Sequence, residues 1–282
     1  MPYQTENKLA ALHARLGALA RDGWIAVAFS GGLDSRFLAH AAKLGGLRPL
    51  LLHAEGPHIA VAETAFALEC AQENGFDFLK LEANPLEVPE VAANSRMRCY
   101  HCKHALFSRL LREAEPLALC DGTQASDSSA YRPGVAALRE LGVASPLADA
   151  GLTKPEIRAL AASTGMSFPE QHARPCLLTR FAYGMSPDEK TLRAFDQAEA
   201  LIEGYLRLFA ARHGIKAPDF RLRQTKEGAE LHLTPFPLLE KESLAGTLRK
   251  QLEECVADVT GRPLAAIRQM ESLSGYFDKE GA

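Results

Sequence analysis

The sequence lacks the features of membrane proteins and of disulfide-rich secreted proteins. No apolar run among its 282 residues is long enough to span a bilayer, and no secretory signal is visible in the amphipathic stretch from Met1 to Arg21. In a chain of this size without a leader, its six cysteines indicate reduced thiols and not a disulfide framework. We therefore expect a cytoplasmic protein that does not bind membranes.

An excess of charge of one sign is also missing. The chain has 32 basic and 35 acidic residues, for a net charge of −3, so it has no general attraction for nucleic acid and we do not expect a nucleic-acid partner. It has no G-x-x-x-x-G-K-[ST] motif, which disfavours a P-loop kinase or ATPase. Its single C-x-x-C, Cys99 and Cys102, has no second pair to complete a strong zinc signature. A redox pair, an iron–sulfur cluster and a structural pair stay open, and the cluster is the less favoured.

A glycine turn between a strand and a helix is the most informative feature that is present. The strand-like run from Trp24 to Phe29 leads directly into Ser30-Gly31-Gly32-Leu33-Asp34-Ser35, and a helix-periodic stretch follows. Backbone N–H groups at such a turn, with the helix dipole behind them, bind anions, and glycine allows close approach of a phosphate. Asp34 is read as a magnesium ligand or a helix cap. The turn predicts a site for a metal-bound pyrophosphate.

Alternation of strands and helices predicts an α/β fold for the first part of the chain. Four short apolar runs read as strands of a parallel sheet with helices on both faces: 24–29, 48–53, 76–81 and 117–121. Ligands of such sheets bind beyond the carboxyl ends of the strands, where Ser30, His53 and Asp121 stand. In the next loop Gly122 permits close approach of a ligand. Asp127 could bind a metal or a hydroxyl, and Arg132 could bind a phosphate or a carboxylate. The alternative is a polar surface turn with an ion pair.

A smaller α+β domain is expected after a boundary near Gly184. A capping box at 153–156 starts a helix that ends before Gly165, and a second at Ser186–Glu189 starts a helix that reaches about His213. The runs 220–225 and 229–233 predict a hairpin, and a last helix is expected over 238–259. We assign residues 1–184 to nucleotide binding and 185–282 to substrate binding or oligomerisation.

Cys176 lies in an irregular stretch between Arg174 and Arg180. Thiolate is the reactive form of cysteine, and neighbouring guanidinium groups favour it, so we interpret Cys176 as a nucleophile and the two arginines as its helpers. The alternative is a small buried hydrophobe.

Charged side chains alternate along the predicted hairpin. Arg221 and Arg223 share one face, and Glu230 and His232 are expected opposite them. A solvated face of cross-strand charge pairs is the default interpretation, and a second phosphate site is the sharper one.

These segments resemble known families. Ser30–Ser35 resembles the SGGxDS turn of the PP-loop ATP pyrophosphatases. Most of the chain, from about Trp24 to the hairpin, is similar to the LarE family of ATP-dependent sacrificial sulfur transferases in nickel-pincer nucleotide biosynthesis, through these residues: Cys99–Lys103, Asp121–Gly134, Ser145–Leu147, Thr153–Arg158, Pro175–Arg180 and Tyr183-Gly184. The sequence departs from that family at Arg36, where a small residue is common, and at His232, where a carboxylate is common.

The resemblance implies a set of ligands and roles. ATP and Mg²⁺ are the implied cofactors, a pyridinium mononucleotide carboxylate is the acceptor, Cys176 is the sulfur donor, and the protein is a homo-oligomer. Arg221 and Arg223 are implied to bind the substrate phosphate, and Glu199 to bind a metal. The expected ATP and pyrophosphate contacts are Ala28, Ser30, Gly31, Gly32, Asp34, Ser35, His53, Gly122, Asp127 and Arg132.

The implied reaction is sulfur insertion through an adenylate. Cys176 would displace AMP from the adenylated carboxylate and lose its sulfur, leaving dehydroalanine and a thiocarboxylate. One alternative is a catalytic sulfurtransferase that uses Cys99 and Cys102 on the same acceptor or on tRNA. Others are an amide-forming synthetase and a sensor that binds adenine nucleotides without chemistry.

Overall fold

The computed structural model describes residues 3–129, 133–171, 174–240 and 242–279, and the chain divides into two compact units. The first unit contains residues 1–91 and 97–175, and the second contains 92–96 and 176–282. This division lies earlier in the chain than the expected boundary near Gly184, because the segment after Cys176 pairs with second-unit residues. Phe181 forms a β-bridge with Gln224, and the carbonyl of Ala182 accepts a hydrogen bond from the side chain of Asn94 at 2.9 Å.

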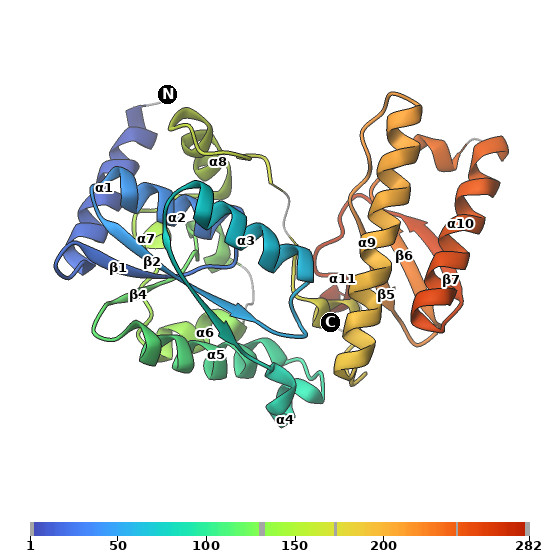
Figure 1. Cartoon of the computed structure of the whole chain (residues 1–282), viewed down its shortest axis with the longest axis horizontal. Helices are drawn as coiled ribbons and strands as arrows, with labels where there is room; N and C mark the ends of the chain where they lie inside the picture. The colour runs from blue at the N-terminus through green and yellow to red at the C-terminus, as the bar shows by residue number, and fades with distance from the viewer. Residues whose placement is uncertain (1–2, 130–132, 172–173, 241, 280–282) are drawn as a thin grey trace. The chain divides into compact units, whose positions relative to one another are not determined.

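The first unit is built on a parallel sheet with the strand order β3-β2-β1-β4 (Figure 1). All four strands predicted from the sequence are present, as β1 (Trp24–Ala28), β2 (Arg48–Glu55), β3 (Asp77–Glu82) and β4 (Leu119–Cys120). Because β1 pairs with β2 on one side and β4 on the other, its carboxyl end lies in the middle of one edge of the sheet. The turn at Ser30–Ser35 therefore starts from an interior strand of the sheet.

Helices cover both faces of this sheet, which confirms the predicted α/β class (Figure 1). Side chains of β1 alternate between the faces, so Ile25 and Val27 join one hydrophobic cluster and Ala26 joins the other. One face carries α1 (Tyr3–Leu19), α2 (Leu33–Leu44), α3 (Val61–Glu73) and α8 (Lys154–Ser163). The other carries α5 (Arg98–Ala114) and α6 (Pro133–Glu140). Shorter helices are α4 (Pro89–Ala92) and α7 (Pro146–Asp149), with single helical turns at Pro85–Glu87 and Ala125–Ser129.

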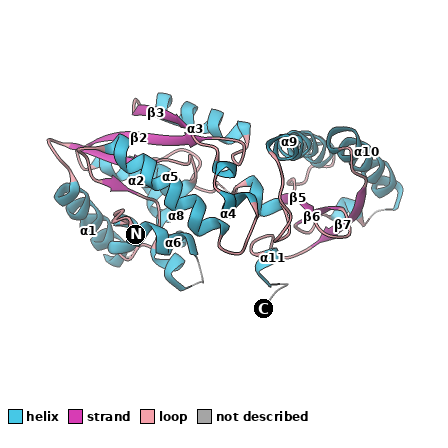
Figure 2. Cartoon of the chain, turned by 90° about the horizontal axis from the view of Figure 1, so that it is seen from below, coloured by secondary structure: helices cyan, strands magenta, loops and turns pink. Residues whose placement is uncertain are grey.

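The second unit is the smaller α+β domain that was predicted. The hairpin is confirmed as β5 (Phe220–Gln224) paired antiparallel with β6 (Ala229–Leu233). A strand that the sequence did not predict, β7 (Leu264–Gln269), adds parallel to β6. The long helices α9 (Glu189–Arg212) and α10 (Glu242–Thr260) pack beside each other on one side of this sheet (Figure 2), and the short helix α11 (Tyr276–Lys279) follows β7. Among the described residues, no helix has the length and apolar character needed to cross a membrane.

Two helix starts differ from the sequence predictions. Ser186 does not cap α9, because Asp188 takes this position and its carboxylate accepts a hydrogen bond from the N–H of Thr191 at 2.8 Å. The last helix does not begin at Leu238, because Pro237 starts a separate single turn, Pro237–Leu239, and α10 begins at Glu242. The capping box at the start of α8 is present as predicted.

Glu156 joins two helices at the start of α8. Its carboxylate accepts hydrogen bonds from the N–H and hydroxyl of Thr153, at 2.9 and 2.7 Å, and from the ammonium of Lys8 on α1 at 2.7 Å. The bond from Lys8 is the largest cause of a pKa lowered from the ordinary 4.5 to about 2. This depressed pKa means that the ionised carboxylate stabilises the folded unit above pH 4.5 and that the effect is lost as the pH falls towards 2.

We predict that Glu156→Gln lowers the free energy of unfolding by about 1 kcal/mol at pH 7, since the site is partly open to solvent and the pair is screened. The difference from wild type should disappear as the pH is lowered from 4.5 to 2. Urea unfolding followed by fluorescence of Trp24, the single tryptophan, reports on the first unit. A difference that stays constant across this pH range would contradict the prediction.

Candidate functional site

The turn at the end of β1 is held by its own hydroxyl groups. The hydroxyls of Ser30 and Ser35 lie 3.2 Å apart, and the Ser35 hydroxyl donates to the carbonyl of Gly32 at 3.1 Å. The N–H of Gly32 points towards the Ser30 oxygen at 3.3 Å. Ser30 is exposed, whereas Gly31 and Ser35 are buried. The turn is therefore open to solvent at Ser30 and packed against the protein at Gly31 and Ser35. Ala28, the last residue of β1, leads into this turn.

Two glycines allow the backbone to pack tightly around this turn. Gly31 has φ +75°, and a Cβ there would lie 2.9 Å from the Cβ of Ala67 on α3. A Cβ on Gly122, in the loop after β4, would lie 3.0 Å from the backbone N of Ser35. The loop after β4 therefore contacts the first turn of α2, as the shared carboxyl edge of a parallel sheet predicts.

Asp34 presents a buried oxygen that has no hydrogen-bond partner among the residues that the structure describes. Its Oδ2 accepts a hydrogen bond from the ammonium of Lys154 at 2.7 Å, while Oδ1 is buried without a hydrogen bond. Burial is the main cause of the raised pKa of Asp34, with a further contribution from Asp127, whereas Lys154 and Arg158 act in the opposite direction. A carboxylate oxygen in this state is suited to a divalent cation, which takes oxygen ligands. Oδ1 of Asp34 is therefore one oxygen of the kind that a magnesium ion takes as a ligand.

Lys154 and Arg158 are site residues that the sequence analysis left without a role. Both lie on α8, and the capping box places Lys154 at the first helical position, facing Asp34. Their spacing of four residues puts them on one side of the helix. The capping box was a usable signal for the position of Lys154, but nothing in the sequence indicated that α8 lies beside α2.

The other predicted residues at the strand ends, His53 and Asp121, make hydrogen bonds within the protein. His53 is fully buried, and its ring nitrogens lie 2.8 Å from the carbonyl of Phe29 and 3.0 Å from the hydroxyl of Thr64. Burial lowers the pKa of His53, so the ring is neutral and fixes the backbone just before the turn. Asp121 accepts hydrogen bonds from Ser145 and Thr123.

Asp127 belongs to the loop after β4, where its carboxylate accepts a hydrogen bond from the N–H of Gln124 at 3.2 Å. Its negative charge contributes to the raised pKa of Asp34, so the two carboxylates are close enough to interact. Arg132 lies outside the described residues.

Cys176 is the first residue of the second unit after Pro175, and it is half-buried. Its carbonyl accepts hydrogen bonds from the N–H and hydroxyl of Thr179, at 3.0 and 2.7 Å, which starts the single helical turn Leu177–Arg180. The thiol therefore stands at the beginning of an ordered turn.

The two arginines that flank Cys176 are both ion-paired. Arg174 lies 3.1 Å from the carboxylate of Glu63 on α3, within the first unit. Arg180 is buried in the second unit and makes a two-pronged contact with Glu199 on α9, at 2.8 and 2.9 Å. The oxygen of Glu199 nearer to Arg180 also accepts the N–H of Leu222 at 2.9 Å. Glu199, expected as a metal ligand, is thus engaged in holding Arg180 and β5.

The hairpin face that carries Arg221 and Arg223 is buried and not the solvated face of the default interpretation. Arg223 is only 4% exposed. Its guanidinium donates to the carbonyls of Thr179 and Leu273 and stacks over Tyr276, 5.0 Å from the ring centre, but its Nε is buried without a partner. Burial, followed by the positive charges of Arg180 and Arg221, lowers the pKa of Arg223 to about 10. An anion at this face would relieve that repulsion.

The predicted cross-strand neighbours are confirmed by the register, which places Arg221 opposite His232 and Arg223 opposite Glu230. Glu230, however, pairs with Arg268 on β7 at 2.8 and 2.9 Å and with His232 at 2.8 Å. This leaves Arg223 without that carboxylate. Arg268 was missed by the sequence analysis because β7 was missed.

The C-x-x-C cysteines lie on the first turns of α5, where Cys99 is exposed and Cys102 is half-buried. Cys120 is fully buried on β4, and burial raises its pKa to about 12. Within the parts of the chain that the structure describes, no three histidine, cysteine or carboxylate side chains are grouped as a metal site requires.

No protein-family model matches the chain. It is 32% identical to an uncharacterized protein of Synechocystis over 98% of this chain and 95% of that protein. It is 28% identical to an uncharacterized protein of Methanocaldococcus jannaschii, covering 71% of this chain and 78% of that protein. It is 31% identical to pyridinium-3,5-bisthiocarboxylic acid mononucleotide synthase of Lactiplantibacillus plantarum, over 63% of this chain and 65% of that protein.

We predict that Gly31→Ala lowers the free energy of unfolding by about 2 kcal/mol or more, because the left-handed backbone and the contact with Ala67 both oppose a Cβ. The matched control is Gly32→Ala. Gly32 has φ −72°, and its added Cβ would meet only the Ser30 hydroxyl at 3.3 Å, so less than about 1 kcal/mol should be lost. Urea unfolding followed by Trp24 fluorescence measures both, and equal losses would contradict this account of the turn.

Proposed function

The chain belongs to the LarE family, and from that premise we propose that it inserts sulfur into a carboxylate of a pyridinium mononucleotide, with ATP as the activating substrate. The name of the Lactiplantibacillus relative supports the acceptor class. The observation that carries the activation step is the turn at Ser30–Ser35, with the unpartnered oxygen of Asp34 at its helix start. A nucleoside triphosphate fits the turn, and a divalent cation bound to its phosphates fits the Asp34 oxygen.

The phosphates of ATP would bind at the N–H groups of the turn and at the hydroxyls of Ser30 and Ser35. Lys154 and Arg158 would supply positive charge to the same region. Asp34 would hold Mg²⁺ through Oδ1, and the ion, when bound, would neutralise the departing pyrophosphate. Lys154 is paired with Oδ2 of Asp34, so binding of the ATP phosphates to Lys154 would compete with this ion pair.

The chemistry would proceed in three balanced steps. An acceptor carboxylate oxygen attacks the α-phosphorus of ATP, and pyrophosphate leaves. The Cys176 thiolate then attacks the acyl carbon of the adenylate, AMP leaves, and a thioester forms. Removal of the Cys176 α-proton breaks its Cβ–S bond, so the sulfur stays on the product as a thiocarboxylate and dehydroalanine remains in the chain.

The phosphate of the mononucleotide would bind at the buried face of β5 and β6. Arg221 and Arg223 offer guanidinium donors there, and Arg223 has a buried Nε without a partner. Arg180 adds to the positive potential but is held by Glu199. An anion is therefore the ligand that this face favours most.

A catalytic sulfur relay through Cys99 and Cys102 is the alternative, on this acceptor or on tRNA. The described cysteines are not grouped with further ligands, which gives an iron–sulfur cluster no support from geometry. A sensor without chemistry would bind the nucleotide and release no pyrophosphate.

We also propose a homo-oligomer in the cytoplasm. Leu201 and Leu208 lie two helical turns apart on α9 and are 44% and 50% exposed, which is unusual for leucines on one side of a long helix. Sedimentation of the purified protein tests this proposal, and a strict monomer would refute it.

We predict that incubation with ATP, Mg²⁺ and a pyridinium-3,5-dicarboxylic acid mononucleotide lightens the protein at Cys176 by the mass of one hydrogen sulfide molecule. Intact-protein and peptide mass spectrometry measure this loss. Cys176→Ala should release pyrophosphate once but form no thiocarboxylate. The matched control, Cys99→Ser, should lose sulfur as wild type does. Turnover by Cys176→Ala would refute the donor role, and loss of activity in Cys99→Ser would favour the relay.

We predict that Arg223→Met raises the Kd for the mononucleotide at least about tenfold, because a charged hydrogen bond to phosphate is lost. Stability should change by less than about 1 kcal/mol, since a buried charge beside Arg180 and Arg221 is removed together with its two carbonyl contacts. The control is Arg207→Met, which removes an exposed arginine on α9 and should leave the Kd unchanged. Titration calorimetry measures both, and equal effects would contradict the assignment.

A further inference from the structure

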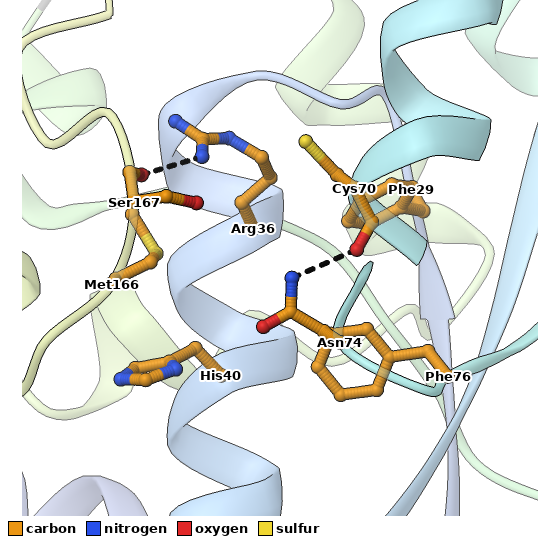
Figure 3. A pocket seen from close by; sticks show the side chains of 8 residues that line it. All are labelled: Phe29, Arg36, His40, Cys70, Asn74, Phe76, Met166 and Ser167. Atoms are coloured by element: carbon orange, nitrogen blue, oxygen red, sulfur yellow. Dashed lines mark hydrogen bonds between the residues drawn. The ribbon is translucent and has the colours of Figure 1, made fainter. Parts of the chain in front are cut away.

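Arg36 is a buried arginine that contacts a segment far away in the sequence. It follows Ser35 on the first turn of α2 and is 5% exposed. Its guanidinium donates to the carbonyls of Ser167 and Phe168, at 2.8 and 2.9 Å, and its Nε and Nη2 both donate to the side-chain oxygen of Gln171, at 3.0 and 2.8 Å. Figure 3 shows this guanidinium reaching from α2 to the backbone at Ser167.

All of these acceptors are neutral oxygens, and the guanidinium is removed from water. Burial is the main cause of the lowered pKa of Arg36. Beside it lies a small pocket of about 10 Å³, with room for about one water molecule, lined in part by His40, Cys70 and Met166 (Figure 3). A desolvated cation of this kind is stable only where its acceptors are held in place. Arg36 and the segment 167–171 therefore fix each other.

The segment is held in a conformation that it would not adopt alone. Phe168 has φ +51°, in the left-handed region that is unfavourable for an aromatic residue, and it is 61% exposed. Its ring lies edge-on to Phe66 on α3 at 6.0 Å, and the Arg36 guanidinium lies over the same Phe66 ring at 5.4 Å. Arg36 thus contacts both the carbonyl of Phe168 and the ring against which Phe168 rests.

The contacts between Arg36 and the segment 167–171, here called the clamp, involve neighbours of residues in the phosphate turn Ser30–Ser35. Arg36 is adjacent to Ser35, and Phe66 is adjacent to Ala67, against which Gly31 packs. The clamped segment ends at Gln171, a short stretch of chain before Cys176. A fixed Gln171, five residues before the thiol in the sequence, limits how far Cys176 can move from it.

We propose that Arg36 is a positioning residue for sulfur transfer, which orders the segment leading to Cys176 against the helix that follows the phosphate turn. The inference rests on the proposed function. Adenylate formation uses the turn itself and does not need the clamp, whereas attack by Cys176 needs the chain before it to be ordered, because small displacements of a reacting group slow a reaction strongly.

The test compares wild type with Arg36→Ala and with Gln171→Ala, which removes two of the four hydrogen bonds and leaves the buried arginine in place. Hydrogen exchange at the amides of Ser167, Phe168, Glu170 and Gln171 should become at least about fivefold faster in both variants. Pyrophosphate release in the first turnover, with ATP, Mg²⁺ and the pyridinium dicarboxylic acid mononucleotide, should stay within about twofold of wild type. Loss of sulfur from Cys176 should slow by about tenfold or more.

The matched control is Glu170→Gln, which removes the exposed contact of the same segment with Arg158 at 3.1 Å. It should change neither exchange nor sulfur loss, since exposed pairs contribute little. Unchanged exchange in Gln171→Ala and Arg36→Ala would overturn the clamp, and faster exchange with normal sulfur loss would overturn its role in transfer. Absence of pyrophosphate release from wild type would instead refute the proposed function, while the exchange measurement would still decide whether Arg36 orders the segment.

Discussion

Buried guanidinium groups fix the irregular segments of this protein. Arg36, Arg180 and Arg223 are each at most 5% exposed, so water cannot satisfy their donors and the protein must supply acceptors. Those acceptors include backbone carbonyls of irregular stretches, at Ser167, Phe168 and Leu273. Arg180 differs, because its carboxylate partner Glu199 lies on α9. Helices and strands would form without these contacts. Between α8 and α9 these contacts add to the ion pair of Arg174 with Glu63 and to the β-bridge of Phe181 with Gln224.

Each buried arginine is satisfied to a different degree, and the differences separate support from binding. Arg180 is matched by a carboxylate in a two-pronged contact, and Arg36 by four neutral hydrogen bonds. Arg223 retains a buried Nε that has no hydrogen bond among the described residues, and its pKa is lowered by burial first and then by the charges of Arg180 and Arg221. A fully matched arginine supports structure, whereas an incompletely matched one favours an anionic ligand. Asp34 shows the same incompleteness with opposite charge, which favours a cation.

The sequence was sufficient where a local rule acts and insufficient where distant segments meet. Apolar runs and glycine positions predicted the four parallel strands, the turn at Ser30 and the hairpin, because period and turn chemistry are local. The strand β7 was missed because Leu264–Gln269 has weak alternation and only half-buried or exposed residues. The partners of Arg36, Arg174 and Arg180 were also beyond prediction, since they lie on other elements. Sequence spacing placed both flanking arginines next to Cys176, but the structure gives each of them a carboxylate elsewhere.

That last difference bears on how a consumed cysteine would be protected. A donor that is used once per chain is wasted by any reaction before the adenylate exists, so permanent activation by two free cations would be a disadvantage. Glu63 and Glu199 offset the charges of Arg174 and Arg180. Activation would then have to come with the substrate, whose phosphates would compete with Glu63 for Arg174, while Arg180 stays paired with Glu199. Under the proposed function, the ion pairs of these arginines delay activation of the Cys176 thiol until an acyl adenylate is present to react with it.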